Sequence, residues 1–262
     1  MKLRMLAGAA LLAMGAASQA QITSPVPPGI AAEESAGFTK GNYAQLDGLP
    51  DWGGIWFLSV ERGPGVAPPP QPRLKGEYLE LYEEWRAEVL ANDGVERRER
   101  GNCSPPGLPR IMRLAQYPYE FLFTPGRITI NQEAWMQTRT IWTDGRDHPP
   151  LEDLTPSYHG HSIGRWEGDT LVVDTIGISD TLEVGEGGRH SDRFRLIERI
   201  HLSPDDPDLL INEMRMEDPL AFVEPLEVVA RYRRDRHGSL IEFQCFENNR
   251  NPVNEDGETL FL

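Results

Sequence analysis

Short segments with alternating apolar and polar residues follow one another along most of this chain, and they constrain its fold more than any other feature. Turn signals such as Pro125-Gly126, Asp144-Gly145 and Gly168-Asp169 separate them. Alternation is typical of strands with one buried face, and regular spacing with hairpin turns is typical of an antiparallel barrel or sandwich. The expected strands cover residues 51–58, 121–124, 127–131, 138–143, 161–167, 170–176, 193–202, 209–216, 226–233 and 240–246.

One segment has helical periodicity instead. Over residues 74–92 the apolar residues recur at spacings of three and four, while glutamate and arginine fill the other face. Strands and helices do not alternate along the chain, which disfavours an α/β fold. The sequence therefore predicts a mainly β domain over residues 50–262, with one helix near its N-terminal side.

The first twenty residues have the pattern of a secretory signal peptide. Lys2 and Arg4 precede an apolar run, and small residues up to Ala20 form a cleavage site. The apolar run is shorter than the roughly 20 residues that span a bilayer, so we expect cleavage rather than a membrane anchor. Residues 21–49 are expected to form an extended arm. The protein is then periplasmic or secreted, without stable membrane insertion.

Charge and cysteine content bear on the partners and on disulfide formation. The chain has 26 Lys and Arg against 41 Asp and Glu, a formal net charge of −15. This balance argues against nucleic acid as a partner and against docking on anionic lipid. Cys103 and Cys245 are the only cysteines, and an oxidising compartment favours a structural disulfide between them over two free thiols.

The turn at Gly168-Asp169 fixes the register of one hairpin. Closing the chain there pairs Glu167 with Thr170 and Ile163 with Asp174, and it places His161 and Asp174 diagonally on one face. A carboxylate beside an imidazole is a common arrangement for a general base. The alternative is a solvated face with ordinary ion pairs.

The segment that begins at His190 carries a second candidate pair. Alternation places His190 and Glu198 on the same face as Phe194 and Leu196, which is the apolar face and is expected to point inward. Buried ionisable groups are costly unless they are paired or used in chemistry. A structural ion pair with an arginine is the alternative.

A metal site is a further possibility. His159 and His161 could share a zinc or another divalent ion, with His190 as a third ligand. The HxH spacing alone is a weak signal, so we expect no metal and keep this set as an alternative.

Substrate-binding groups are expected in and near the loop 144–150, because such loops at a barrel mouth often hold ligands. Arg139 or Arg146 could hold an anionic group in a bidentate contact. Asp144 and Tyr158 complete the candidates, and the alternative role of Asp144 is to cap a turn.

Several motifs resemble those of a large, uncharacterised family of exported bacterial proteins. The resemblance rests on the run 160–175 (GHSIGRWEGDTLVVDT) together with Thr143–Arg146, His148-Pro149, His190-Ser191, Glu198-Arg199 and Asp218-Pro219. It covers the chain from about Asp51 onward and implies export and a shared architecture, but no catalytic roles. Separately, Gly54-Ile55-Trp56 is similar to the Gly-x-Trp of lipocalin-type barrels.

The leading hypothesis is an exported, cofactor-free lyase or isomerase that acts by acid–base chemistry on a small hydrophobic or aromatic molecule inside a lipocalin-like barrel. His161, oriented by Asp174, and His190 with Glu198 would transfer protons. Two alternatives remain. One is a non-catalytic periplasmic binding barrel, which predicts an apolar cavity and a Glu198 paired with arginine. The other is a metal-dependent hydrolase that uses His159, His161 and His190. The sequence does not indicate the substrate or the oligomeric state.

Overall fold

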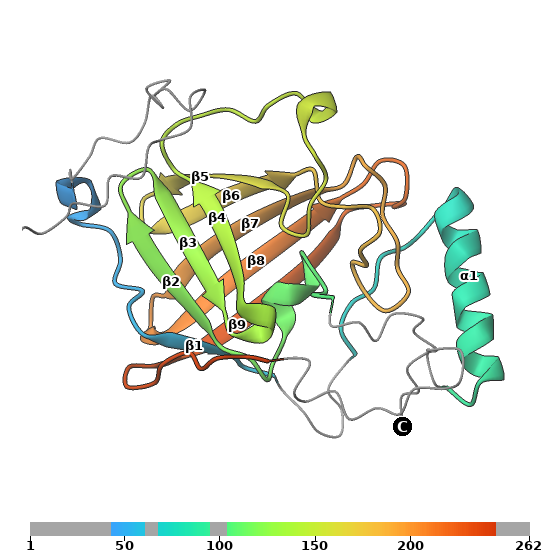
Figure 1. Ribbon diagram of the computed structural model, residues 1–262, viewed down its shortest axis with the longest axis horizontal. Coiled ribbons are helices and arrows are strands. Elements are labelled where there is room, and N and C mark those ends of the chain that lie inside the picture. Colours follow the sequence, from blue (N-terminus) through green and yellow to red (C-terminus); the bar gives the residue numbers. More distant parts are fainter. Residues whose placement is uncertain (1–42, 61–67, 95–103, 245–262) are drawn as a thin grey trace, which may run out of the picture. The chain divides into compact units, whose positions relative to one another are not determined.

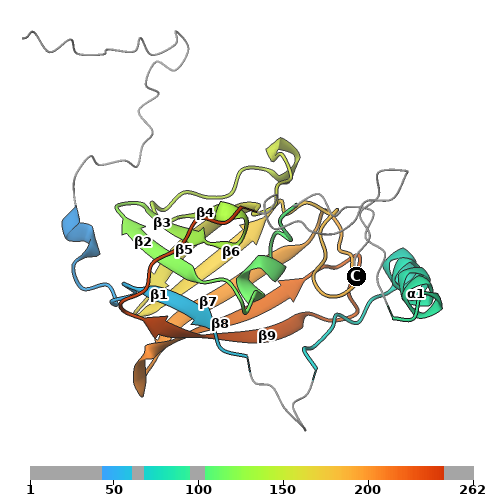
Figure 2. The same cartoon turned by 60° about the horizontal axis from the view of Figure 1, so that its bottom comes forward.

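The computed structural model describes residues 43–60, 68–94 and 104–244, and its centre is a closed nine-stranded β-barrel (Figures 1 and 2). All of these residues belong to one compact unit, Gly37–Leu262. The strands are β1 (Ile55–Leu58), β2 (Tyr119–Thr124), β3 (Arg127–Gln132), β4 (Gln137–Trp142), β5 (His161–Glu167), β6 (Thr170–Ile176), β7 (Arg195–Ser203), β8 (Asp206–Glu217) and β9 (Leu226–Asp235). Short 3-10 helices are η1 (Tyr43–Leu46), η2 (Arg110–Arg113), η3 (Ala134–Met136) and η4 (Leu151–Asp153). The predicted mainly β, lipocalin-like barrel is confirmed.

The strands follow one another around the barrel in sequence order, and all neighbours but one are antiparallel. β1 closes the barrel by pairing antiparallel with β9, whereas β4 and β5 pair in parallel. Nine strands cannot alternate in direction all the way round a closed ring, so one parallel pair is required. A parallel pair needs a long crossover. Here it is the connection 143–160, which arches outside the barrel wall and carries η4 (Figure 1).

The interior of the barrel is filled by alternate residues of the strands. Buried and accessible positions alternate throughout β3, and in β9 from Leu226 to Arg233. Trp56, Ile130, Ile141, Leu196 and Leu210 are all fully buried, and burial of such a side chain contributes roughly 1.5–3 kcal/mol. The core therefore occupies the space in which a wider barrel of this kind would hold a ligand.

The segment that contains η2 closes one end of the barrel. Ile111 and Met112 are fully buried, and their backbone carbonyls accept hydrogen bonds from two barrel tyrosines. Tyr119 Oη donates to the oxygen of Ile111 at 2.8 Å, and Tyr232 Oη donates to that of Met112 at 2.7 Å. These bonds satisfy hydroxyls that would otherwise be buried without partners.

Aromatic side chains fill the opposite end. The ring of Trp52 meets those of Phe121, Phe123 and Trp166 edge to face, with centroids 5.3 to 5.5 Å apart. The backbone oxygen of Trp52 also accepts a hydrogen bond from Trp56 Nε1 at 2.9 Å. This aromatic cluster fixes the chain where it enters β1.

The predicted helix is present as α1 (Gly76–Ala91), within the expected range 74–92. It has no fully buried residue. Lys75 N donates to the oxygen of Ala221 at 2.9 Å just before the helix, and Trp85 packs so tightly on Gly187 that a Cβ at this glycine would clash. In the described part of the chain, no helix is both long enough and apolar enough to cross a membrane.

The barrel is mainly antiparallel, as expected, and the β4–β5 pair is its one parallel pair. One expectation about a strand is wrong. Residues 240–244 of the predicted strand 240–246 do not form a strand, because side chains rather than a neighbouring strand accept their backbone hydrogen bonds. Ile241 N, for example, donates to Glu133 Oε2 at 3.0 Å. The expected signal peptide, the arm before residue 43, and Cys103 and Cys245 lie outside the described residues.

Candidate functional site

The β5–β6 hairpin has the predicted register, and the barrel now shows where its two faces point. Ile163 lies opposite Asp174, and Glu167 opposite Thr170, as expected. Ser162 and Thr175 are buried and point into the barrel. His161 and Asp174 therefore lie on the outer face of the wall, and the expectation that they face the interior is wrong. Parity along the strands had given the two faces correctly, but closure of the barrel decided which of them is inside.

A buried polar network occupies the middle of the barrel. Arg139 and Glu198 are both fully buried and form an ion pair through Arg139 Nη2 and Glu198 Oε2. Arg139 also donates to Thr175 Oγ1 at 3.0 Å and to Ser162 Oγ at 3.2 Å. Asn212 Nδ2 donates to Glu198 Oε1 at 2.9 Å. Arg139 and Glu198 are thus each other's partners, which satisfies both charges inside the core.

A cluster of ionisable side chains lies on the outer wall, where the crossover 143–160 brings His148 against His161. Their Nδ1 atoms are 2.8 Å apart, a hydrogen-bond distance, and the two rings meet edge to face. His148 Nε2 lies 3.7 Å from Asp174 Oδ2, an ion-pair distance longer than a hydrogen bond. Arg195 donates to both oxygens of Asp174, at 2.8 and 2.5 Å. We call His148, His161 and Asp174 the outer-wall cluster.

Electrostatics keep both imidazoles of this cluster neutral near pH 7. Burial lowers the pKa of His148, and Arg195 adds to this effect against the opposing carboxylate of Asp174. Burial also lowers the pKa of His161, with further contributions from His148 and Arg146. The hydrogen bond from Arg195 to Asp174 raises the pKa of the guanidinium. A neutral imidazole with a fixed orientation is the form that accepts a proton.

The hydrogen bond between the two Nδ1 atoms requires one donor and one acceptor. We assign the His148 proton to Nε2, the nitrogen that lies 3.7 Å from the carboxylate of Asp174, so that His148 Nδ1 is the acceptor. His161 Nδ1 is then the donor, and its Nε2 keeps the lone pair. The cluster can therefore present one basic nitrogen whose tautomer is set by the next two residues.

The start of the crossover lies close to this cluster. Arg146 donates to Asp144 through Nε at 2.9 Å and Nη2 at 2.5 Å, and its guanidinium carbon lies 3.8 Å from the ring centre of Trp142. The hydrogen bond from Arg146 lowers the pKa of Asp144. Tyr158, 40% exposed, is anchored by its backbone oxygen, which accepts from Leu108 N at 2.8 Å. The structure thus brings Arg146 and Asp144 to the cluster, while Arg139 lies in the core.

His190 is buried elsewhere. It precedes β7, it is 1% exposed, its Nδ1 lies 2.9 Å from the oxygen of Ser191, and its ring packs on Phe194 with centroids 4.4 Å apart. Burial lowers its pKa. Glu198 is held by Arg139 instead, so the structure does not bring the expected pair of His190 and Glu198 together.

The three histidines of the metal alternative have separate surroundings. His159 Nε2 lies 3.3 Å from Gln137 Oε1, and burial together with the charge of Arg139 lowers the pKa of His159 to about 4. His161 contacts His148. Among the described residues, no group of three or more His, Cys, Asp and Glu side chains is arranged to hold a metal ion.

Sequence reasoning placed His161 and Asp174 together but did not include His148 in the site. His148 is 13 residues from His161 and reaches it only because the parallel β4–β5 pair forces the crossover back along the wall. The rigid run His148-Pro149-Pro150 was the sequence feature that drew attention to His148, but it does not indicate which residue His148 contacts.

Comparison with known proteins assigns no family. No protein-family model matches the chain, and a search of curated proteins finds no similar sequence. The functional argument therefore rests on the barrel and its side chains.

Proposed function

We propose that this protein is an exported enzyme of the lyase or isomerase type, which uses the acid–base chemistry of the outer-wall cluster on a small hydrophobic or aromatic molecule. The observation that carries the proposal is the 2.8 Å contact between His148 Nδ1 and His161 Nδ1. Both reaction types need one positioned base that removes a proton from carbon. The proposal requires no cofactor for this step.

His161 is the proposed base. Its Nε2 removes a proton from the substrate, and the electron pair of the broken C–H bond forms a new double bond. In an isomerisation the same nitrogen returns the proton at another carbon, and in an elimination a leaving group departs. His148 and Asp174 are positioning residues, because they fix the tautomer of His161 and so direct its Nε2 lone pair to the substrate.

The surroundings support an oxyanion at the same place. Arg146, which lies over Trp142, is the cation near His161, and the carboxylate of its partner Asp144 offsets part of its charge. Negative charge that develops on a substrate oxygen during proton removal would be stabilised there. Trp142 offers apolar surface beside it.

The test uses a substrate that reports on any positioned base. In 5-nitrobenzisoxazole, removal of the C–H proton breaks the N–O bond and releases a coloured phenolate. We expect the full chain to open this ring faster than free imidazole at equal concentration. Because the base must be neutral and burial lowers the His161 pKa, the midpoint of the pH–rate profile should lie below the usual histidine value of about 6.5.

Matched variants identify the residue. His161→Gln should abolish the acceleration, and His237→Gln, at an exposed histidine of the chain, should leave it unchanged. His148→Gln should raise the apparent pKa of the rate profile, because the charge interaction with His148 helps to lower it. Equal rates for the unaltered chain and His161→Gln would refute the proposal.

A further inference from the structure

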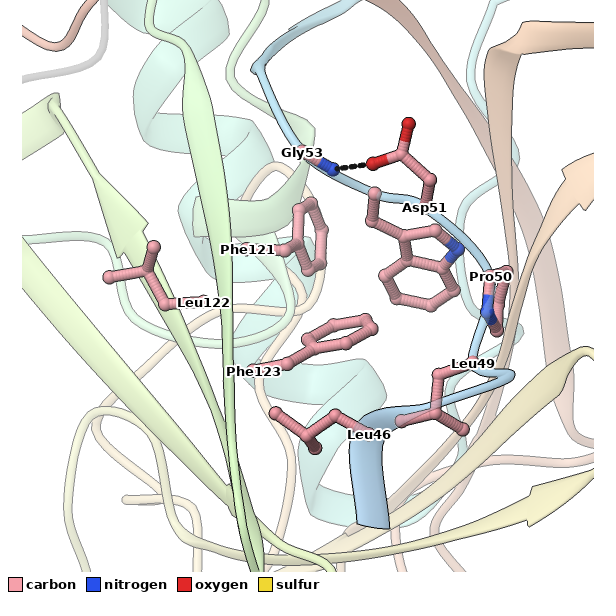
Figure 3. Close-up of a pocket in the computed structure, with 9 residues that line it drawn as sticks. Leu46, Leu49, Pro50, Asp51, Gly53, Phe121, Leu122 and Phe123 are labelled. Carbon is pink, nitrogen blue, oxygen red and sulfur yellow. Dashed lines mark hydrogen bonds between the residues drawn. The ribbon is translucent and has the colours of Figure 1, made fainter. Parts of the chain in front are cut away.

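A pocket of about 270 Å³ opens at the barrel rim, between the segment that follows η1 and strand β2 (Figure 3). Its walls are mostly apolar and include Leu46, Leu49, Trp52, Phe121, Leu122 and Phe123. Figure 3 shows the rings of Phe121 and Phe123 facing the side chains of Leu46 and Leu49 across the pocket. It shares no residue with the outer-wall cluster.

Aromatic rings form the inner wall of this pocket. Trp52 is 2% exposed and packs edge to face on Phe121 and Phe123, at 5.3 and 5.4 Å between centroids. Such edge-to-face packing is the preferred geometry for adding a further ring. The volume lies just below the lower end of the usual range for ligand pockets, about 300 Å³, and therefore suits a small ligand.

The charge at the rim is already compensated. Asp51 is the acidic residue of the lining, and its Oδ1 accepts from Gly53 N at 2.9 Å. Arg234 Nη1 donates to its Oδ2 at 3.0 Å, and Arg236 lies 3.5 Å away. The pocket therefore offers no unpaired charge to a ligand, and an ionic ligand would lose hydration without gaining a partner.

The apolar, aromatic walls and the compensated charge together limit what can bind here. We propose that the rim pocket binds a small uncharged aromatic molecule. This inference goes beyond the proposed acid–base function and does not depend on it.

The test measures the retention of three related probes by equilibrium dialysis against the full chain. We expect naphthalene and 2-naphthol both to be retained, because the pocket walls offer aromatic and aliphatic contacts to either molecule. The anion 2-naphthoate should bind about tenfold or more weakly than both, because the pocket offers its carboxylate no unpaired cation. No retention of 2-naphthol, or tighter binding of 2-naphthoate, would overturn the proposal.

Two leucine variants locate the binding. Leu122 lines the pocket and is 43% exposed, so Leu122→Glu should fold and should weaken 2-naphthol binding by about tenfold or more, because it adds an unpaired carboxylate to the wall. Leu220 is 54% exposed and does not line the pocket, so Leu220→Glu is the matched control and should bind like the unaltered chain. Unchanged binding by Leu122→Glu would show that the probe binds elsewhere.

Discussion

The buried ion pair of Arg139 and Glu198 gives the sharpest stability prediction. Both side chains are fully buried in the barrel, so each charge is stabilised in the core only as long as its oppositely charged partner is present. In Arg139→Met the apolar stem is retained, but Glu198 keeps only the hydrogen bond from Asn212 at 2.9 Å. Loss of one partner of a buried pair typically costs about 3–5 kcal/mol, a large part of the roughly 5–15 kcal/mol that stabilises a folded domain.

The assay is urea unfolding at neutral pH, followed by circular dichroism and tryptophan fluorescence. Arg139→Met should lower the free energy of unfolding by about 3–5 kcal/mol. The double variant Arg139→Met/Glu198→Leu should recover most of that loss, because it removes both charges and leaves an apolar core. Arg195→Met is the control, since Arg195 is 47% exposed in its pair with Asp174 and its loss should cost less than about 1 kcal/mol.

Two results would refute this reasoning. One is an Arg139→Met variant as stable as Arg195→Met, which would show that water reaches the pair in the barrel. The other is a double variant no more stable than the single one. That result would assign the cost to lost packing rather than to an unpaired carboxylate.

Two further predictions concern pH and backbone conformation. The pKa of His159 lies near 4 in the folded chain and near 6.5 when unfolded, so the unfolded state binds the proton first as pH falls. Stability should therefore be fully present above about pH 6.5 and decline by up to about 3 kcal/mol towards pH 4. His159→Gln should reduce this decline in urea titrations and His237→Gln should not, and an unchanged decline in His159→Gln would contradict the assignment. Gly160 and Gly168 both have positive φ, so alanine costs roughly 1–2 kcal/mol at either. Only at Gly160 would the Cβ also clash with the Ile176 oxygen, so Gly160→Ala should lower the melting temperature clearly more, and equal losses would show that the clash is relieved.

The parts of the fold that the sequence predicted are those that local interactions decide. The β5–β6 hairpin has the predicted bounds and register, because a two-residue turn fixes which residues face each other. Helix α1 follows in the same way from its periodicity. The parallel pairing of β4 with β5 could not be predicted, because it follows from the number of strands in the closed ring rather than from any segment.

The same distinction between local and long-range interactions applies to the candidate site. Alternation along the strands placed His161 with Asp174 on one face and Glu198 with the apolar residues, and both placements agree with the structure. The contact of His148 with His161 and the pairing of Arg139 with Glu198 join segments 13 and 59 residues apart in the sequence. The sequence by itself determined the strands, their local register and the composition of each face, because these depend on neighbours along the chain. Only the tertiary structure decided which face lies inside and which charged groups meet, because closure of the barrel and the path of the crossover bring together residues that no local pattern connects.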